Sequence, residues 1–139
     1  MSPGPTSQPA SKPHVEVAAA IILDRGQVLI SQRDESSHLS GYWEFPGGKR
    51  EPHESFEECV LREIREELNV EIEVERYFET VRYEYGEKVV LLKFYFCRYL
   101  SGEARALGCR QFKWVPLPDL GCYRFPPANE PILQKLLQE

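Results

Sequence analysis

Three carboxylates crowd together in residues 62–68, whose sequence is REIREEL. On a helix, where each residue turns by about 100°, Glu63, Glu66 and Glu67 would occupy roughly a 100° arc. Like charges three or four residues apart on a helix repel one another by roughly 0.2–0.5 kcal/mol per pair. Neighbouring arginines, solvent or a bound cation could offset this cost. Clustered carboxylate oxygens suit Mg²⁺, which binds through a few carboxylates, waters and substrate phosphates.

A salt-bridged surface helix is the alternative interpretation of the same residues. Glu58–Arg62 and Arg62–Glu66 are spaced for ion pairs four residues apart. The apolar residues of the segment recur every four positions and form one stripe: Phe56, Val60, Ile64 and Leu68. Because the three acids lie about a quarter turn from this stripe, we expect them at the edge of the core, facing a cleft. The helix alone leaves both interpretations open.

The elements that would position this helix are mostly strands. Ser55 followed by Glu58 has the form of a capping box, which predicts the start of the helix. Residues 15–33 have the pattern of a β-hairpin, and Pro46, Gly47 and other breakers in 44–54 predict irregular structure. Further strands are expected at 70–83, 88–100 and 111–117, and a closing helix at 128–138. Strands on both sides of one helix predict a mixed sheet covered by helices on both faces.

Composition and charge limit the possible partners. The chain has 139 residues, which favours one domain, and a net charge of −5. Residues 44–73 hold ten acids and four bases, so the acidity is concentrated in one segment. This distribution lacks the basic patch of a duplex-DNA binder, and we expect no nucleic-acid polymer as partner. A polyphosphate could bind if a cation bridged the two anions.

The remaining features of the chain predict an ordinary reducing environment. No two cysteines form a C-x-x-C pair, so we expect free thiols and a cytoplasmic location rather than a zinc site. No apolar run approaches the roughly 20 residues of a membrane span, and the histidines show no metal-ligand spacing. Residues 1–13 are rich in Pro and Ser and are expected to be a disordered tail before a domain at 14–139.

Residues 48–70, GKREPHESFEECVLREIREELNV, resemble the Nudix box, G-x5-E-x7-R-E-U-x-E-E-x-G-U, where U is aliphatic. The matching positions are Gly48, Glu54, Arg62, Glu63, Ile64, Glu66, Glu67 and Val70. Asn69 replaces a Gly of the pattern, and Asn also tolerates the left-handed conformation of a helix C-cap.

The resemblance implies a Nudix hydrolase of α/β class, with a mixed β-sheet sandwiched between helices. It also implies hydrolysis of a nucleoside diphosphate linked to another group, with Mg²⁺ or alternatively Mn²⁺ as cofactor. The metal ligands would be Glu63, Glu66, Glu67 and the carbonyl group of Gly47. Glu63 would accept the proton of the attacking water, and Arg62 would orient the glutamates.

The segments WEFPGGK (43–49) and FPPANEP (125–131) resemble the MutT type, pyrophosphohydrolases that remove 8-oxo-dGTP from nucleotide pools. That resemblance implies nucleotide contacts from Arg33 and His38, a base pocket lined by Phe45, and reading of the base by Asn129. Lys49 could contact a phosphate.

Each of these residues also has a purely structural interpretation. Asn129 could be only a helix N-cap, His38 an exposed loop residue and Phe45 part of the core. Arg33 could pair with Asp34 or Glu35, and Lys49 could simply be exposed to solvent.

One departure from the MutT pattern affects the mechanism. An additional metal-binding Glu is expected before the last strand, and Gly108 stands at about that place. Either fewer carboxylates hold the metal, or Glu103 reaches in, or the subtype differs. Two other functions stay open: a pyrophosphohydrolase of CTP or modified pyrimidine nucleotides, and a non-catalytic nucleotide-binding module. The sequence is compatible with a monomer or a homodimer.

Overall fold

The computed structural model describes residues 13–36 and 39–138. Residues 1–12 of the expected tail and the candidate His38 therefore lie outside the described residues. The strands are β1 (His14–Asp24), β2 (Gln27–Gln32), β3 (Trp43–Glu44), β4 (Gly47–Lys49), β5 (Glu71–Tyr85), β6 (Lys88–Ser101) and β7 (Gln111–Pro116). The α-helices are α2 (Phe56–Leu68) and α3 (Glu130–Leu137), and the 3₁₀ helices are η1 (Leu117–Cys122) and η2 (Pro127–Asn129). None of these helices is long and apolar enough to cross a membrane.

The described strands form one mixed sheet, as the sequence predicts. The strand order is β3-β2-β1-β6-β5, with β4 paired to β1 and β7 paired to β2. β1 and β6 run parallel, whereas the other pairs are antiparallel. The expected β1–β2 hairpin is present, but its two strands pair only at Leu23–Val28 and Asp24–Gln27. β1 also pairs with β4, and β2 pairs with β3 at Ser31 and Gln32 and with β7 along its whole length.

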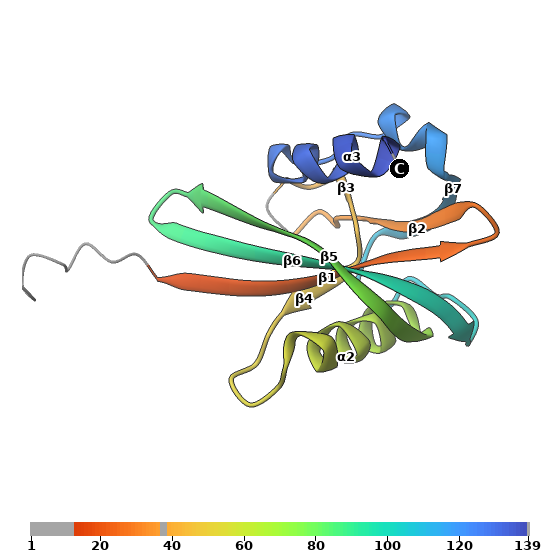
Figure 1. Cartoon of the computed structure of the whole chain (residues 1–139), viewed down its shortest axis with the longest axis horizontal. Coiled ribbons are helices and arrows are strands. Elements are labelled where there is room, and N and C mark those ends of the chain that lie inside the picture. Colours follow the sequence, from red (N-terminus) through yellow and green to blue (C-terminus); the bar gives the residue numbers. More distant parts are fainter. Residues whose placement is uncertain (1–12, 37–38, 139) are drawn as a thin grey trace, which may run out of the picture.

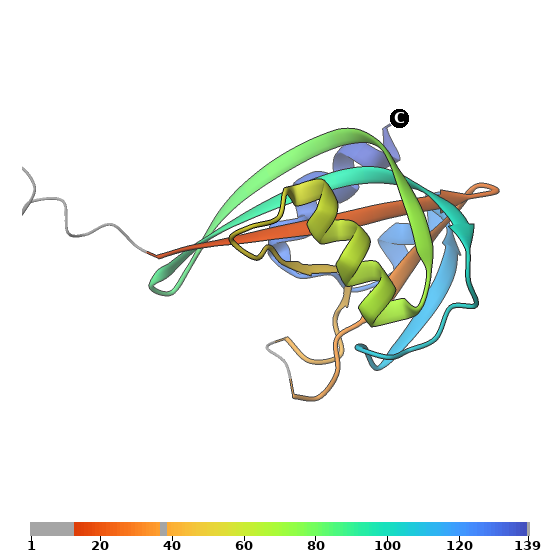
Figure 2. The same cartoon turned by 90° about the horizontal axis from the view of Figure 1, so that it is seen from below.

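Helices cover both faces of the sheet, which confirms the expected sandwich. Figure 1 shows α2 on one side of the strands and α3 on the other, and Figure 2 shows α2 lying across the sheet. Alternate residues of β1 reach the two cores: Ala18 and Ala20 pack with α2, and Ala19 and Ile21 pack with α3. Because β1 is buried on both faces, its sequence is a continuous apolar run.

The segment after β2 differs from the expectation. Residues 44–54 were expected to be irregular, but Trp43–Glu44 and Gly47–Lys49 form the short strands β3 and β4. The glycines permit this pairing, because a Cβ at Gly47 would overlap with the carbonyl oxygen of Ala18. In a sequence, glycine usually predicts the end of a strand. Here, because glycine has no side chain, it allows β4 to approach β1 closely.

The ends of α2 agree with the sequence. The Ser55 hydroxyl accepts a hydrogen bond from the Glu58 backbone N–H (3.0 Å), and the Ser55 N–H donates to the Glu58 carboxylate (2.8 Å). Asn69 ends the helix in the left-handed conformation, with a φ of 61°. The Glu58 carboxylate accepts the hydrogen bond from the Ser55 N–H, and this contact replaces the suggested Glu58–Arg62 ion pair. The alternative of a helix held mainly by surface ion pairs therefore loses one of its two pairs.

Candidate active site

Arg62 connects α2 to the loop that precedes it. Its Nε and Nη2 donate to the two carboxylate oxygens of Glu54 at 3.0 and 2.6 Å. Its Nη1 donates to Glu63 at 2.9 Å and to Glu66 at 3.2 Å, and Nη2 also reaches the Lys49 carbonyl oxygen at 3.1 Å. The bidentate contact lowers the pKa of Glu54 to about 2. Arg62 therefore contacts Glu63 and Glu66 on the helix and also holds the loop through Glu54 and Lys49.

Glu63 lies at the point where α2 meets β4. A Cβ built at Gly48 would overlap with the Glu63 carboxyl group, so only glycine leaves room for this carboxylate. Burial raises the pKa of Glu63, and the charges of Glu66 and Glu54 add to this effect, while Arg62 opposes it. A carboxylate with a raised pKa is a stronger proton acceptor than an exposed one.

Glu67 is the most strongly perturbed of the acids. Burial raises its pKa to about 8, and the negative charges of Glu44 and Glu63 contribute, against smaller opposite effects of Ser31 and Arg33. Its Oε1 atom is buried and has no hydrogen-bond partner within the described part of the chain. A buried carboxylate without a partner is costly, so this oxygen is available for a ligand.

These carboxylates match the donor set of a hard divalent cation. All the donors are oxygens, one of them is buried and unpartnered, and their mutual repulsion would be relieved by positive charge. Within residues 13–36 and 39–138, no three His, Cys, Asp or Glu side chains are already arranged to hold a metal ion. Glu63 and Glu66 are instead turned toward Arg62.

Glu44, on the edge strand β3, lines a pocket that extends to the start of α3. Its volume is about 360 Å³. The lining residues are Val17, Arg33, Leu39, Glu44, Tyr83, Val90, Leu92, Pro126, Pro127, Ala128 and Asn129. Arg33 donates a hydrogen bond to the Glu44 carboxylate at 2.6 Å, whereas the sequence suggested Asp34 or Glu35 as its partner. Glu44 thus lines the pocket and also raises the pKa of Glu67, which joins the two parts of the site.

Asn129 also lines this pocket. It is only 6% exposed, and its side chain does not cap α3 although it occupies the N-cap position. The expected N-cap position of Asn129 is therefore confirmed, but its side chain makes no capping hydrogen bond. An amide group in the lining of a pocket could donate and accept hydrogen bonds.

The structure places two other candidates away from the pocket lining. Phe45 is buried in the core, where its ring lies 5.9 Å from that of Phe94 and 5.2 Å from that of Phe125. Lys49 is exposed and lines a different pocket, beside His14 and Arg50.

Glu103 does not supply the additional carboxylate. Its side chain is 82% exposed and lies 3.4 Å from Arg105. Gly108 packs directly on Glu67 instead: its N–H donates to the Glu67 carbonyl oxygen at 3.1 Å, and a Cβ there would lie 3.2 Å from Glu67 Cγ. In this structure the Glu103 carboxylate pairs with Arg105 and not with the acids of α2.

Sequence reasoning missed Glu44 and Ser31, which the structure brings to Glu67. Glu44 was part of the WEFPGGK segment but received no role. The available signal was strand alternation: Leu29 faces α2, so Ser31, two residues later on the same strand, faces α2 as well. Ser31 pairs with Glu44 across β2 and β3, which puts Glu44 on the same face.

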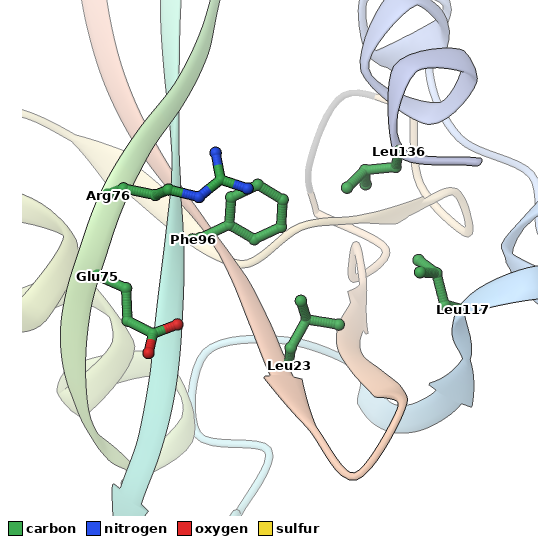
Figure 3. Close-up of a pocket in the computed structure, with 6 residues that line it drawn as sticks. All are labelled: Leu23, Glu75, Arg76, Phe96, Leu117 and Leu136. Atoms are coloured by element: carbon green, nitrogen blue, oxygen red, sulfur yellow. The ribbon is translucent and has the colours of Figure 1, made fainter. Parts of the chain in front are cut away.

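Another pocket, at the opposite end of α3, lacks this chemistry. Figure 3 shows Arg76 alongside the Phe96 ring, with three leucines (Leu23, Leu117 and Leu136) across the gap. The Arg76 guanidinium lies 4.2 Å from the Phe96 ring centroid. None of the acids of residues 48–70 lines this pocket, so it is not the candidate active site.

Comparisons with known proteins agree with this geometry. Residues 17–135 match the NUDIX domain family. The chain is 32% identical to "8-oxo-dGTP diphosphatase" of Escherichia coli K12 over 123 residues, which cover 88% of this chain and 95% of the relative. It is 33% identical to "CTP pyrophosphohydrolase" of the same organism, covering 88% and 91%. The crystal structure of the MutT protein from Methanosarcina mazei Go1 superposes with a TM-score of 0.82 at 27% identity, covering 92% and 96%. The chain therefore belongs to the NUDIX domain family and is a Nudix hydrolase of the MutT type.

Proposed function

We propose that this nucleotide pyrophosphohydrolase converts 8-oxo-dGTP to 8-oxo-dGMP and pyrophosphate. The proposal rests on the position of Glu44. This residue lines the apolar pocket and also lies near enough to Glu67, on α2, to raise the pKa of that residue. A nucleotide base in the pocket would thereby place its phosphates beside the acids. The relative named 8-oxo-dGTP diphosphatase supports this choice of substrate.

The pocket residues would bind the nucleoside. The Asn129 amide offers a donor and an acceptor, which a purine edge can satisfy as a pair. Arg33, fixed by Glu44, would bind the sugar or the first phosphate, and Phe45 would support the pocket wall from the core through Phe125. His38 and Lys49 remain further candidates for nucleotide contacts.

The carboxylates would hold Mg²⁺ through Glu66, Glu67 and the carbonyl group of Gly47, with Glu63 nearby and Mn²⁺ as a substitute. A divalent cation at such a site neutralises phosphate charge and lowers the pKa of a bound water. Glu63 would take the proton from the attacking water, because its raised pKa makes it a better base. Arg62 keeps that carboxylate in place through its 2.9 Å contact.

Initial rates of pyrophosphate release test this proposal. The panel is 8-oxo-dGTP, dGTP, CTP, 5-methyl-dCTP and dATP, each with Mg²⁺ and with Mn²⁺, and Glu67→Gln as the inactive control. A strong preference for 8-oxo-dGTP is the expected result. Equal rates for dGTP and 8-oxo-dGTP would overturn the substrate assignment.

A pyrimidine substrate is the second candidate, because the relative named CTP pyrophosphohydrolase is as similar as the first. Preference for the cytidine nucleotides would establish it and would retain the same acids. Binding of nucleotide without turnover would instead indicate a non-catalytic module.

The assembly and location follow as proposals. We infer a monomer or homodimer that binds a small nucleotide and no nucleic-acid polymer. All four cysteines, Cys59, Cys97, Cys109 and Cys122, are free thiols, which agrees with the proposed cytoplasmic location.

A further inference from the structure

Ser31 is an unusual residue in the core of this protein. It lies in β2, is completely buried, and its hydroxyl group has no hydrogen-bond partner in the part of the chain that the structure describes. Buried hydroxyl groups are nearly always hydrogen-bonded, since an unpaired one loses its contacts with water. Alanine or valine would fill such a strand position without this cost. The hydroxyl group therefore needs an explanation other than packing.

The strand register aims this hydroxyl group at the acids. Ser31 pairs with Glu44 on β3 and with Phe112 on β7. Phe112 and Leu29 pack with the core beneath α2, so the side chain of Ser31 points to the same face. There it lies close enough to the Glu67 carboxyl group to lower the pKa of that group, although the two side chains do not form a hydrogen bond of ordinary geometry. Glu67 Oε1 is itself buried and without a partner among the described residues.

We propose that Ser31 is a positioning residue that holds Glu67 for a divalent cation, an inference that rests on the proposed function. When Glu67 is ionised, the Ser31 O–H donates to one carboxylate oxygen and fixes the plane of the carboxylate. The other oxygen is then directed at the cation. Arg62 contacts Glu63 and Glu66, so Ser31 supplies for Glu67 the orientation that Arg62 supplies for the other two acids. Groups that orient metal ligands in this way typically change metal affinity 10–100-fold when removed.

Mn²⁺ binding to the metal-free full-length chain tests this role, with free Mn²⁺ followed by electron paramagnetic resonance. The variants are Ser31→Ala, which removes the hydroxyl group, and Ser31→Thr, which retains it. Cys97→Ala is the matched control, because it removes one buried heavy atom from the same core without contacting the acids. We expect Ser31→Ala to weaken Mn²⁺ binding about tenfold, and Ser31→Thr and Cys97→Ala to stay within about threefold of the wild type.

Thermal unfolding of the same metal-free proteins separates positioning from stability. Ser31→Ala should unfold at the wild-type temperature or higher, because it removes an unpartnered hydroxyl group. The proposal is overturned if Ser31→Ala binds Mn²⁺ as tightly as the wild type, or if Cys97→Ala weakens binding to the same extent.

Turnover distinguishes this inference from the proposed function. Weaker Mn²⁺ binding in Ser31→Ala, with no nucleotide hydrolysed by the wild type, would support positioning and reject the function. Hydrolysis of 8-oxo-dGTP with identical Mn²⁺ affinities would reject positioning alone. A wild type that binds no Mn²⁺ would overturn both.

Discussion

Replacement of Glu67 by glutamine should inactivate the enzyme and yet stabilise the metal-free protein. Glu67 is buried next to Glu44 and Glu63, and its pKa in the folded protein is about 8, compared with an ordinary value of 4.5. The folded protein therefore holds this proton more tightly than the unfolded chain does. Glutamine keeps the shape of the protonated side chain and has no charge to bury.

The size of the expected stabilisation by Glu67→Gln and its pH dependence follow from these two pKa values. Because the folded pKa is raised, the free energy of unfolding of the wild type falls as the pH rises from 4.5 to 8. At pH 7 the raised pKa of Glu67 costs the folded state on the order of 3 kcal/mol, because the unfolded chain releases a proton that the folded protein retains; at pH 5 the cost is less than about 1 kcal/mol. Glu67→Gln removes this loss, so its advantage over the wild type should grow across the same range.

Urea unfolding in EDTA at pH 5, 7 and 8 measures this difference. Glu66→Gln is the matched control, since it makes the same charge change one residue away on a side chain that is 61% exposed. The control should stay within about 1 kcal/mol of the wild type, as exposed ion pairs contribute little. Saturating Mg²⁺ should reverse the order, because only the wild type retains the full set of ligands. Glu67→Gln that is less stable than the wild type at pH 8 in EDTA would refute the reasoning.

Three further changes test other parts of the site. Gly48→Ala should lower kcat at least about 100-fold, because the new Cβ displaces the Glu63 carboxylate. Gly121→Ala is the control: there is open space around its Cβ, so kcat should stay within about twofold of the wild type. Equal losses of kcat in the two variants would contradict the packing argument. Asn129→Ala should raise KM for 8-oxo-dGTP about tenfold and shift the unfolding midpoint little, because its side chain does not cap α3; a large loss of stability would assign it a structural role. Asn69→Ala should cost about 1–2 kcal/mol in urea unfolding, and Asn69→Gly much less, because φ is 61° at this position.

The sequence predicted the elements whose determinants are local. Ser55 and Glu58 are three residues apart, so the capping box and the start of α2 could be inferred from side-chain chemistry. Asn69 likewise marked the end of the helix. The pattern of residues 15–33 predicted a β-hairpin, and β1 and β2 form it.

The parts that were missed depend on contacts between distant segments. Glu44 reaches Glu67 because β3 pairs with β2 at Ser31, a register that no short pattern encodes. The short strand β4 forms because Gly47 and Gly48 let it approach β1, although glycines in a sequence normally predict a break. Neither feature has a periodicity that a single sequence could reveal.

The three acids of α2 differ in surroundings although they are adjacent on the helix. Glu66 is mostly exposed, Glu63 is held between Arg62 and Gly48, and Glu67 is buried beside Ser31. A salt-bridged surface helix would need only the first of these arrangements, and it would not bury Glu67 at the expense of stability. The burial of Glu67 makes sense if a cation supplies the missing charge, which answers why carboxylates are crowded here. Burial of the Glu67 carboxylate then lowers the stability of the metal-free protein and raises its affinity for the cation.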